Sequence, residues 1–187
     1  MARLPLLEWL DLYATKARDG DFRKLGQCKK LAYLSLGSTN ASDASLSEIG
    51  QLEHLRELHL FAAPISDQGV AELARLDKLE ILNIDAGLEP ERQGKITDAS
   101  LKALAGLKHL KSLSLNSTSV TDEGMKHVAV HEQLEVLNLT LTGVTDVGLK
   151  ELAALPRLQK LSLFGTRVTD RGVAELQKAL PHLKIQR

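Results

Sequence analysis

The 187-residue sequence has one cysteine, no excess of either charge, and no long run of uncharged apolar residues. Because Cys28 is alone, no disulfide can form within the chain, and a reducing compartment is permitted. Lys and Arg together number 24, as do Asp and Glu, so no net field draws nucleic acid or anionic lipid to the chain. No stretch approaches the roughly 18 apolar residues of a membrane span. The sequence therefore argues against nucleic-acid and membrane partners.

The start of the chain is apolar and carries Arg3, which is typical of a signal peptide, but Glu8 and Asp11 interrupt the run. We therefore expect no export signal and a cytoplasmic location. With 43% hydrophobic and 26% charged residues, the chain is large enough to bury a continuous core. We expect a single domain over residues 1–187.

One pattern, L-x-x-L-x-L, recurs seven times along the chain. The successive first leucines are 24, 24, 24, 31, 24 and 24 residues apart; they are Leu7, Leu31, Leu55, Leu79, Leu110, Leu134 and Leu158. A constant period of this kind indicates a repeat protein. The one longer spacing predicts an inserted loop of seven residues at 88–94. It is either a functional loop on a rigid scaffold or a tolerated surface insertion.

The spacing of apolar residues changes within each unit. In the sixth unit Leu137 and Leu139 are two apart, as on one face of a strand, whereas Leu149, Leu152 and Leu155 are three apart, as on a short helix. Neither element can bury its apolar side alone, so the units must stack. The sequence predicts an α/β solenoid, a curved horseshoe with a parallel sheet on the concave side and short helices on the convex side.

The link between strand and helix is also repeated. It reads V-T-D-x-G in the last three units, at 120–124, 144–148 and 168–172, and an aspartate recurs in register in all seven. These motifs resemble the α/β leucine-rich-repeat proteins, the ribonuclease-inhibitor-like group, and in particular bacterial proteins built on T-x-V-T-D-x-G-L. The resemblance covers nearly the whole chain and implies about seven 24-residue repeats. It does not name a function, because such repeats serve many unrelated binding roles.

Two polar positions recur in every unit or nearly so. Threonines stand where the commoner repeat has Asn, and we expect them to hold the turn: Thr15, Thr39, Thr118, Thr142 and Thr166. The row of aspartates could bind cations, but we favour capping, in which each Asp or the Ser/Thr beside it accepts a bond at a helix start. These aspartates are Asp19, Asp43, Asp67, Asp98, Asp122, Asp146 and Asp170.

Other candidate sites have simpler interpretations. His127 and His131 have a metal-ligand spacing, but His131 lies in an apolar slot that Leu occupies in other units, and no third ligand is apparent. Cys28 occupies the same slot and is expected to be buried. The segment GLEPERQGK at 87–95 lacks the Gly and the Ser/Thr of a phosphate loop. We therefore predict no metal, no cofactor and no enzymatic activity.

The two ends differ. The first unit has no polar cap, so we expect a truncation, a covering partner or self-association through the N-terminal edge. The segment 180–185 is typical of a closing strand, which predicts that the natural C-terminus lies close by.

Residues between the sheet leucines should point away from the core, on the concave side. Five of the six aromatic residues fall there, and only Phe22 is expected in the core. Interface hot spots are enriched in Trp and Tyr, although bulky rings also suit a strand surface. The predicted protein-binding residues on this face are Trp9, Tyr13, Tyr33, His59, Phe61, Asp85, Asn116, Asn138 and Phe164.

The sequence thus predicts a protein-interaction module that binds a protein partner on its concave face. The alternative is a structural scaffold segment of a larger repeat or multidomain protein whose function is located elsewhere.

Overall fold

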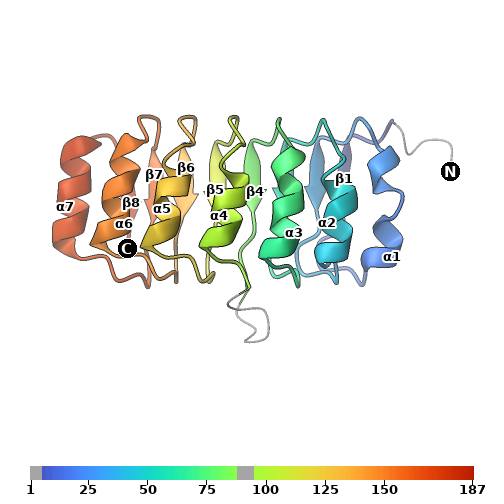
Figure 1. Cartoon of the computed structure of the whole chain (residues 1–187), viewed down its shortest axis with the longest axis horizontal. Helices are drawn as coiled ribbons and strands as arrows, with labels where there is room; N and C mark the ends of the chain where they lie inside the picture. Colours follow the sequence, from blue (N-terminus) through green and yellow to red (C-terminus); the bar gives the residue numbers. More distant parts are fainter. Residues whose placement is uncertain (1–5, 88–94) are drawn as a thin grey trace.

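The computed structural model describes residues 6–87 and 95–187, which form one row of β-α units (Figure 1). Eight strands make a single parallel sheet in which each strand pairs with its neighbours in chain order. The strands are β1 (Trp9–Asp11), β2 (Tyr33–Ser35), β3 (Glu57–His59), β4 (Ile81–Asn83), β5 (Ser112–Ser114), β6 (Val136–Asn138), β7 (Lys160–Ser162) and β8 (Lys184–Gln186). The expected closing strand is therefore confirmed as β8.

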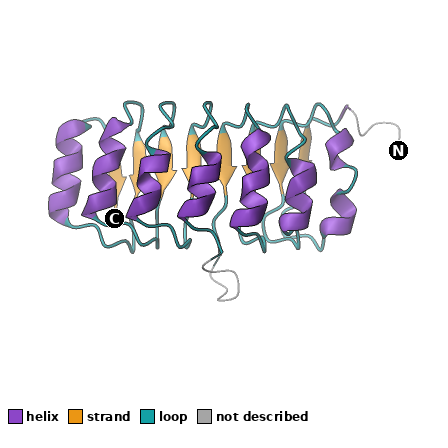
Figure 2. Cartoon of the chain, viewed as in Figure 1, coloured by secondary structure: helices purple, strands orange, loops and turns teal. Residues whose placement is uncertain are grey.

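The helices cover one face of this sheet and leave the other uncovered (Figure 2). They are α1 (Asp19–Phe22), α2 (Asp43–Ile49), α3 (Asp67–Glu72), α4 (Asp98–Leu104), α5 (Asp122–Val128), α6 (Asp146–Glu151) and α7 (Asp170–Ala179). Short 3-10 turns follow α1, α3 and α6, at Leu25–Gln27, Leu73–Arg75 and Leu152–Ala154. Strand βn and helix αn make unit n, so the architecture expected from the leucine period is confirmed.

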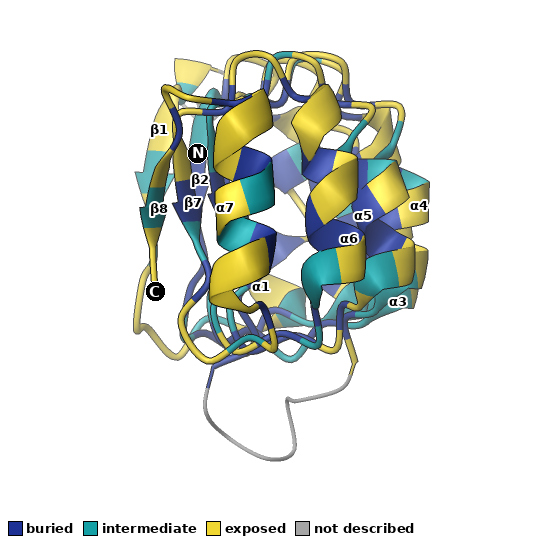
Figure 3. Ribbon diagram, turned by 90° about the vertical axis from the view of Figure 1, so that its left-hand side faces the viewer, coloured by how far each residue is buried: buried dark blue, intermediate teal, exposed yellow. Residues whose placement is uncertain are grey.

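Leucines fill the space between the sheet and the helices. The strand register aligns the central residue of every strand, so Leu10, Leu34 and Leu58 begin a row that runs through β8. Each unit adds apolar residues from its helix, and the buried residues form one continuous cluster. In a view along the stack, the buried parts of the strands and helices face one another (Figure 3). Phe22 and Cys28 belong to this cluster, with 1% exposure each, as their positions in the repeat predict. Burial raises the pKa of the Cys28 thiol, which makes it a poor nucleophile.

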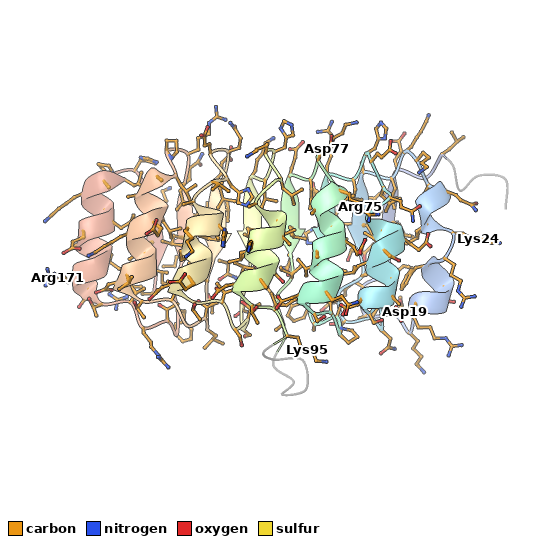
Figure 4. The ribbon with its side chains drawn as sticks, in the orientation of Figure 1. Asp19, Lys24, Arg75, Asp77, Lys95 and Arg171 are labelled. Atoms are coloured by element: carbon orange, nitrogen blue, oxygen red, sulfur yellow. The ribbon has the colours of Figure 1, made fainter. Side chains whose placement is uncertain are left out.

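The insertion in unit 4 does not interrupt the stack. β4 and β5 pair Leu82 with Leu113 although these residues are 31 apart in sequence. Lys95, labelled in Figure 4, accepts a hydrogen bond on its carbonyl from the Asp67 amide at 3.0 Å, which ties the end of the insertion to unit 3. The predicted loop at 88–94 lies outside the described residues.

Threonine hydroxyls hold the turn after five of the strands, as predicted, whereas Ala63 and Gly87 stand at this position in units 3 and 4. Thr39 Oγ1 donates to the Leu36 carbonyl at 2.6 Å, and Thr142 Oγ1 donates to Leu139 in the same way. The residue before each threonine has a positive φ, for example Ser38 at 54°, a conformation that costs energy for a residue with a Cβ. The hydroxyl therefore stabilises a bend that the backbone alone disfavours.

Ser and Thr residues cap the helices, but the aspartates do something else. The Ser42 hydroxyl accepts a hydrogen bond from the Ala44 amide, as a capping residue should. Asp19, labelled in Figure 4, instead accepts from the Ser42 amide at 2.8 Å and from the Ser42 hydroxyl at 2.7 Å, in the next unit. The expected cap is thus the hydroxyl residue, while the carboxylate holds the cap of its neighbour.

The same pair of bonds recurs between every two neighbouring units. We call this series the aspartate ladder; its links are Asp19–Ser42, Asp43–Ser66, Asp67–Thr97, Asp98–Thr121, Asp122–Thr145 and Asp146–Thr169. The link from Asp67 crosses the insertion without a change in geometry, since its oxygens lie 2.8 Å from the Thr97 amide and 2.6 Å from its hydroxyl. The aspartates are engaged in holding units together, which argues against the cation-binding interpretation.

The burial of His131 should make the stability of the fold depend on pH. It is 2% exposed, and burial lowers its pKa from the ordinary value of 6.5, although a bond between Nδ1 and the Leu107 carbonyl at 3.0 Å opposes the shift. The unfolded chain therefore binds more protons, so stability should fall as the pH decreases below about 6.5. Urea unfolding at pH 7.5 and 5.5 should show this loss, and His131→Leu should reduce it. His54→Gln, at an exposed site, is the matched control; an unchanged pH slope in His131→Leu would contradict the assignment.

Among residues 6–87 and 95–187, no helix is both long and apolar enough to cross a membrane.

Candidate functional site

The side of the sheet that faces away from the helices carries the predicted binding residues. We call it the sheet face. Trp9, Tyr13 and Phe164 are 58%, 55% and 64% exposed there, while Tyr33 and Phe61 are half-buried. Large apolar rings are usually buried. Three strongly exposed rings on one face do not pack in the core, so they need another explanation than the stability of the fold.

Three rings form a group at the N-terminal end of the sheet face. The β1–β2 register places Trp9 beside Tyr33, and their rings stack with centroids 5.0 Å apart and planes 12° apart. Tyr33 also meets the His59 ring at 5.4 Å, diagonally across β2 and β3. His59 Nε2 lies 3.7 Å from a carboxylate oxygen of Glu57. The side chains in this group therefore support one another across three strands.

Beside these rings the surface is hollowed to a volume of about 380 Å³. We call this depression the aromatic hollow; it is lined by Asp11, Tyr13, Tyr33, Ser35, Gly37, His59, Phe61 and Asn83. Gly37 creates it, because it stands between Tyr13 and Phe61 at the position where both neighbouring strands carry a ring. A Cβ on Gly37 would lie 3.0 Å from Tyr13 Cδ2 and 3.3 Å from the Phe61 carbonyl oxygen.

The centre of the sheet face is polar and internally bonded. Asn138 donates from Nδ2 to the Ser114 hydroxyl at 3.0 Å and accepts from the Thr140 amide at 3.0 Å. Asn116 accepts from the Ser117 hydroxyl at 3.2 Å. Both asparagines are half-buried. Phe164 follows β7, six strands from Tyr13 and so about 29 Å away, which separates it from the aromatic hollow.

Asp85 departs from its predicted place on the exposed surface. It is only 8% exposed, and its Oδ1 accepts a hydrogen bond from the Asn116 amide at 2.7 Å. Burial raises its pKa although bonds from Ser114, Asn116 and Asn83 partly oppose the shift. The expectation that Asp85 is exposed was wrong because its carboxylate serves the backbone of the next unit. Its part in binding a partner stays a prediction.

The described residues contain no group of three or more His, Cys, Asp or Glu that could hold a metal ion. His131 is buried, and its Nδ1 lies 3.0 Å from the Leu107 carbonyl oxygen, so this nitrogen is engaged by the backbone and not by a metal shared with His127. Glu80, just before β4, forms two ion pairs: its carboxylate lies 2.6 Å from Lys111 Nζ and also contacts the Arg56 guanidinium. These two bonds lower the pKa of Glu80, and they neutralise cations that a nucleic-acid surface would leave free.

The N-terminal end of the solenoid exposes a second apolar surface. A hollow of about 180 Å³ lies there; its lining includes Leu7, Leu10, Leu12, Phe22, Leu25 and Cys28. Leu7, Leu10 and Leu12 are half-buried, whereas the matching leucines of later units are fully buried. Self-association through this end stays a prediction.

The rings of the aromatic hollow could be named from the sequence, but the hollow itself was missed. The signal was present, since Gly37 is the only glycine among the seven residues at this position, where Tyr13, Phe61 and Phe164 carry rings. A missing side chain between two large ones indicates a depression, and this reading needs the strand register as well as the repeat.

Comparisons with known proteins agree with this architecture. A family model described as "Leucine Rich repeat" matches residues 51–74, 106–129 and 132–153. Two solved structures from Listeria monocytogenes str. 4b F2365 are similar. An internalin, InlF, has a TM-score of 0.59 at 20% identity, and an internalin C2, InlC2, has a TM-score of 0.68 at 21% identity.

These matches cover 100% and 99% of this chain. The chain spans 62% of the InlF chain and 82% of the InlC2 chain. No curated protein matches the chain. The chain thus contains leucine-rich repeats and has the fold of a leucine-rich-repeat solenoid with an open parallel sheet.

Proposed function

We propose that this chain is a protein-interaction module that binds a partner protein through the sheet face, without a cofactor or a catalytic step. The observation that carries the proposal is the group of rings at the N-terminal end of the sheet face, beside the aromatic hollow. Tyr and Trp rings at a protein surface offer a large contact area with little rotamer entropy to lose. Such clusters supply most of the binding energy in many interfaces.

The charge pattern supports a protein rather than a polyanion as the partner. The chain has 24 basic and 24 acidic side chains, and the acids Asp11 and Glu57 lie on the sheet face among the rings. Nucleic-acid sites combine rings with cations that neutralise phosphates, and this part of the sheet face has the opposite charge.

The proposal predicts that removing three rings abolishes binding. In an affinity capture from host lysate, Trp9→Ala/Tyr33→Ala/Phe61→Ala should lose the partner that the wild type retains. Truncating even one hot-spot ring costs about 2 kcal/mol or more, so the affinity should fall at least about 30-fold. Titration calorimetry with the purified partner then measures this change, and circular dichroism checks that the variant is folded.

The matched control removes exposed apolar side chains elsewhere. Val130, in the turn after α5, is 42% exposed, and Val147, in α6, is 67% exposed. Val130→Ala/Val147→Ala should therefore bind the partner as the wild type does. If the ring variant and the control retain the same partner equally, the sheet-face proposal is wrong. The alternative, a scaffold segment of a longer protein with its function elsewhere, then takes its place.

A further inference from the structure

We propose that the aromatic hollow binds the guanidinium group of an arginine side chain that the partner protein inserts into the sheet face. This inference rests on the proposed function and adds the chemistry that the site recognises. Three properties of the hollow support the proposal: the arrangement of its rings, the negative charge of its lining, and the hydrogen-bond acceptors that remain free to bind a ligand.

Three rings line the hollow. Tyr13 follows β1 and Phe61 follows β3, and the Tyr13 ring leans over Gly37, since its Cδ2 and Cε2 would lie 3.0 Å and 3.3 Å from a Cβ placed there. The volume of about 380 Å³ beside these rings has room for a flat group in contact with them. Tyr33 adds a third ring and is held in place by Trp9, which stacks on it. A cation within about 6 Å of such rings is attracted to their faces.

The charge of the lining favours a cation. Asp11 contributes a carboxylate, and His59 is the one basic side chain among the lining residues. The ion pairs within the described residues do not involve Asp11, so its charge is not neutralised locally. His59 itself lies against Glu57. A carboxylate or phosphate ligand would face an unpaired anion here, whereas a cation gains a partner.

The available hydrogen-bond acceptors suit a flat donor. Asp11 Oδ1 accepts from the Tyr13 amide at 2.8 Å, which orients the carboxylate and leaves Oδ2 for a ligand. Ser35, which is 5% exposed, also lines the hollow and carries a hydroxyl that can accept a hydrogen bond. Guanidinium has five N–H donors in one plane and stacks on aromatic faces, whereas ammonium is compact and more strongly hydrated. The combination of rings and a carboxylate therefore selects arginine over lysine.

Trp9 is the single tryptophan of the chain, so its fluorescence reports directly on this site. The probes are the peptide acetyl-Gly-Arg-Gly-amide and its citrulline analogue, which has nearly the same shape but no charge. Titrations of the full chain should change the Trp9 emission, with the arginine peptide binding at least about tenfold more tightly than the citrulline peptide. Backbone amide shifts of Ser35 and Gly37, read by NMR, locate the binding.

Two variants test the roles of Asp11 and of the hollow at Gly37. Asp11→Asn keeps the acceptor for the Tyr13 amide but removes the charge, and it should reduce the affinity for the arginine peptide to that of the citrulline peptide. Asp77→Asn makes the same charge change at an exposed loop beyond α3, at the upper edge in Figure 4, and should bind as the wild type does. Gly37→Val places a side chain against the Tyr13 ring, which must then move within the hollow, and should abolish the amide shifts.

Equal affinities for the two peptides would overturn the inference, as would unchanged binding in Asp11→Asn or shifts that avoid Ser35 and Gly37. These failures are separate from a failure of the proposed function. If the ring variant loses its partner while the arginine peptide does not bind, the sheet face is still the binding surface, and only the recognition of arginine is wrong.

Discussion

Asp67→Ala should lower the free energy of unfolding by about 2–4 kcal/mol, because it removes one carboxylate that holds two units together. Asp67 accepts bonds from the amides of Thr97 and Ser100 and from both of their hydroxyls. Each of these four donors lies near the start of α4. A bond to a charged acceptor contributes about 1.5–3 kcal/mol, and donors left without a partner add a penalty where they are buried, as at Ser100.

The position of Asp67 makes the consequence larger than a local loss. In a solenoid each unit contacts only its neighbours, so one weak interface divides the stack into two parts. Unit 4 carries the insertion between β4 and α4, and Asp67 of α3 bonds to the start of α4 directly after it. Urea unfolding followed by circular dichroism should therefore show a broader transition in Asp67→Ala, or two transitions, in addition to the lower stability.

Asp170→Asn is the matched control for the aspartate ladder. Asp170 has the same place in unit 7, but its side chain is 98% exposed and contacts Arg187 rather than a following cap. Exposed ion pairs contribute about 0–1 kcal/mol, so this variant should unfold nearly as the wild type does. Equal losses in the two variants would mean that the bonds between units do not contribute the stability assigned to them.

The ladder also predicts sensitivity to acid. Burial alone would raise the pKa of Asp67, but the bonds from Ser100 and Thr97 outweigh it and lower the pKa below the ordinary value of 3.8. The pKa of Asp19 is lowered in the same way, against burial, by bonds from Ser45 and Ser42. The bonds of Asp67 and Asp19 therefore stabilise the fold fully above the ordinary pKa, and this contribution is lost as the pH falls through the lower value of the folded state.

The second large effect is expected from Gly148→Ala, which should cost about 3 kcal/mol. Gly148 packs directly on Asp122 of the preceding unit and donates its amide to Asp122 Oδ1 at 2.9 Å. A Cβ there would lie 2.5 Å from that oxygen, 2.8 Å from Met125 Cγ and 2.9 Å from the backbone Cα of Asp122. The backbone cannot yield as a flexible side chain does, so the two units must move apart. Thermal or urea unfolding measures the loss.

Gly148→Ser and Gly20→Ala separate this clash from a general effect of losing glycine. Units 2 and 4 carry serine at the position of Gly148, and the Ser45 and Ser100 hydroxyls donate to Asp19 and Asp67. Gly148→Ser should therefore recover part of the stability that Gly148→Ala loses. A Cβ on Gly20 would meet no atom within 4 Å, so Gly20→Ala should be neutral or slightly stabilising. If Gly148→Ala is also neutral, Gly148 does not pack closely enough on Asp122 for a Cβ to clash, and the explanation is wrong.

The strands, the core and the threonine turns could be predicted from the sequence because each depends on residues within one unit. Leu137 and Leu139 show the strand by their spacing alone, and Thr142 follows the strand at a constant offset. The role of Asp122 could not be found in this way. Its partners Thr145 and Gly148 belong to the next unit, so the assignment needs the relative height of two neighbouring helices, which a repeat pattern does not give.

The same limit explains the candidate site. The repeat period places Asp85 and Phe61 at equivalent positions, yet Asp85 is buried and Phe61 is half-buried. The difference comes from the Asn116 amide, which draws the Asp85 carboxylate against the next unit. The aromatic rings were predicted because the alternation of a strand suffices to place them outside the core. The hollow between them depends on three neighbouring strands at once.

The aspartate ladder also bears on how such a chain can change its length. Every unit from the second to the sixth bonds through a hydroxyl residue to the unit before it and through a carboxylate to the unit after it. Each of these units can therefore form the same bonds with any of the others. Duplicating one 24-residue segment, or deleting one, would join a carboxylate to a hydroxyl again with no compensating substitution. Genetic events that add or remove whole units therefore preserve the fold while they lengthen or shorten the sheet face.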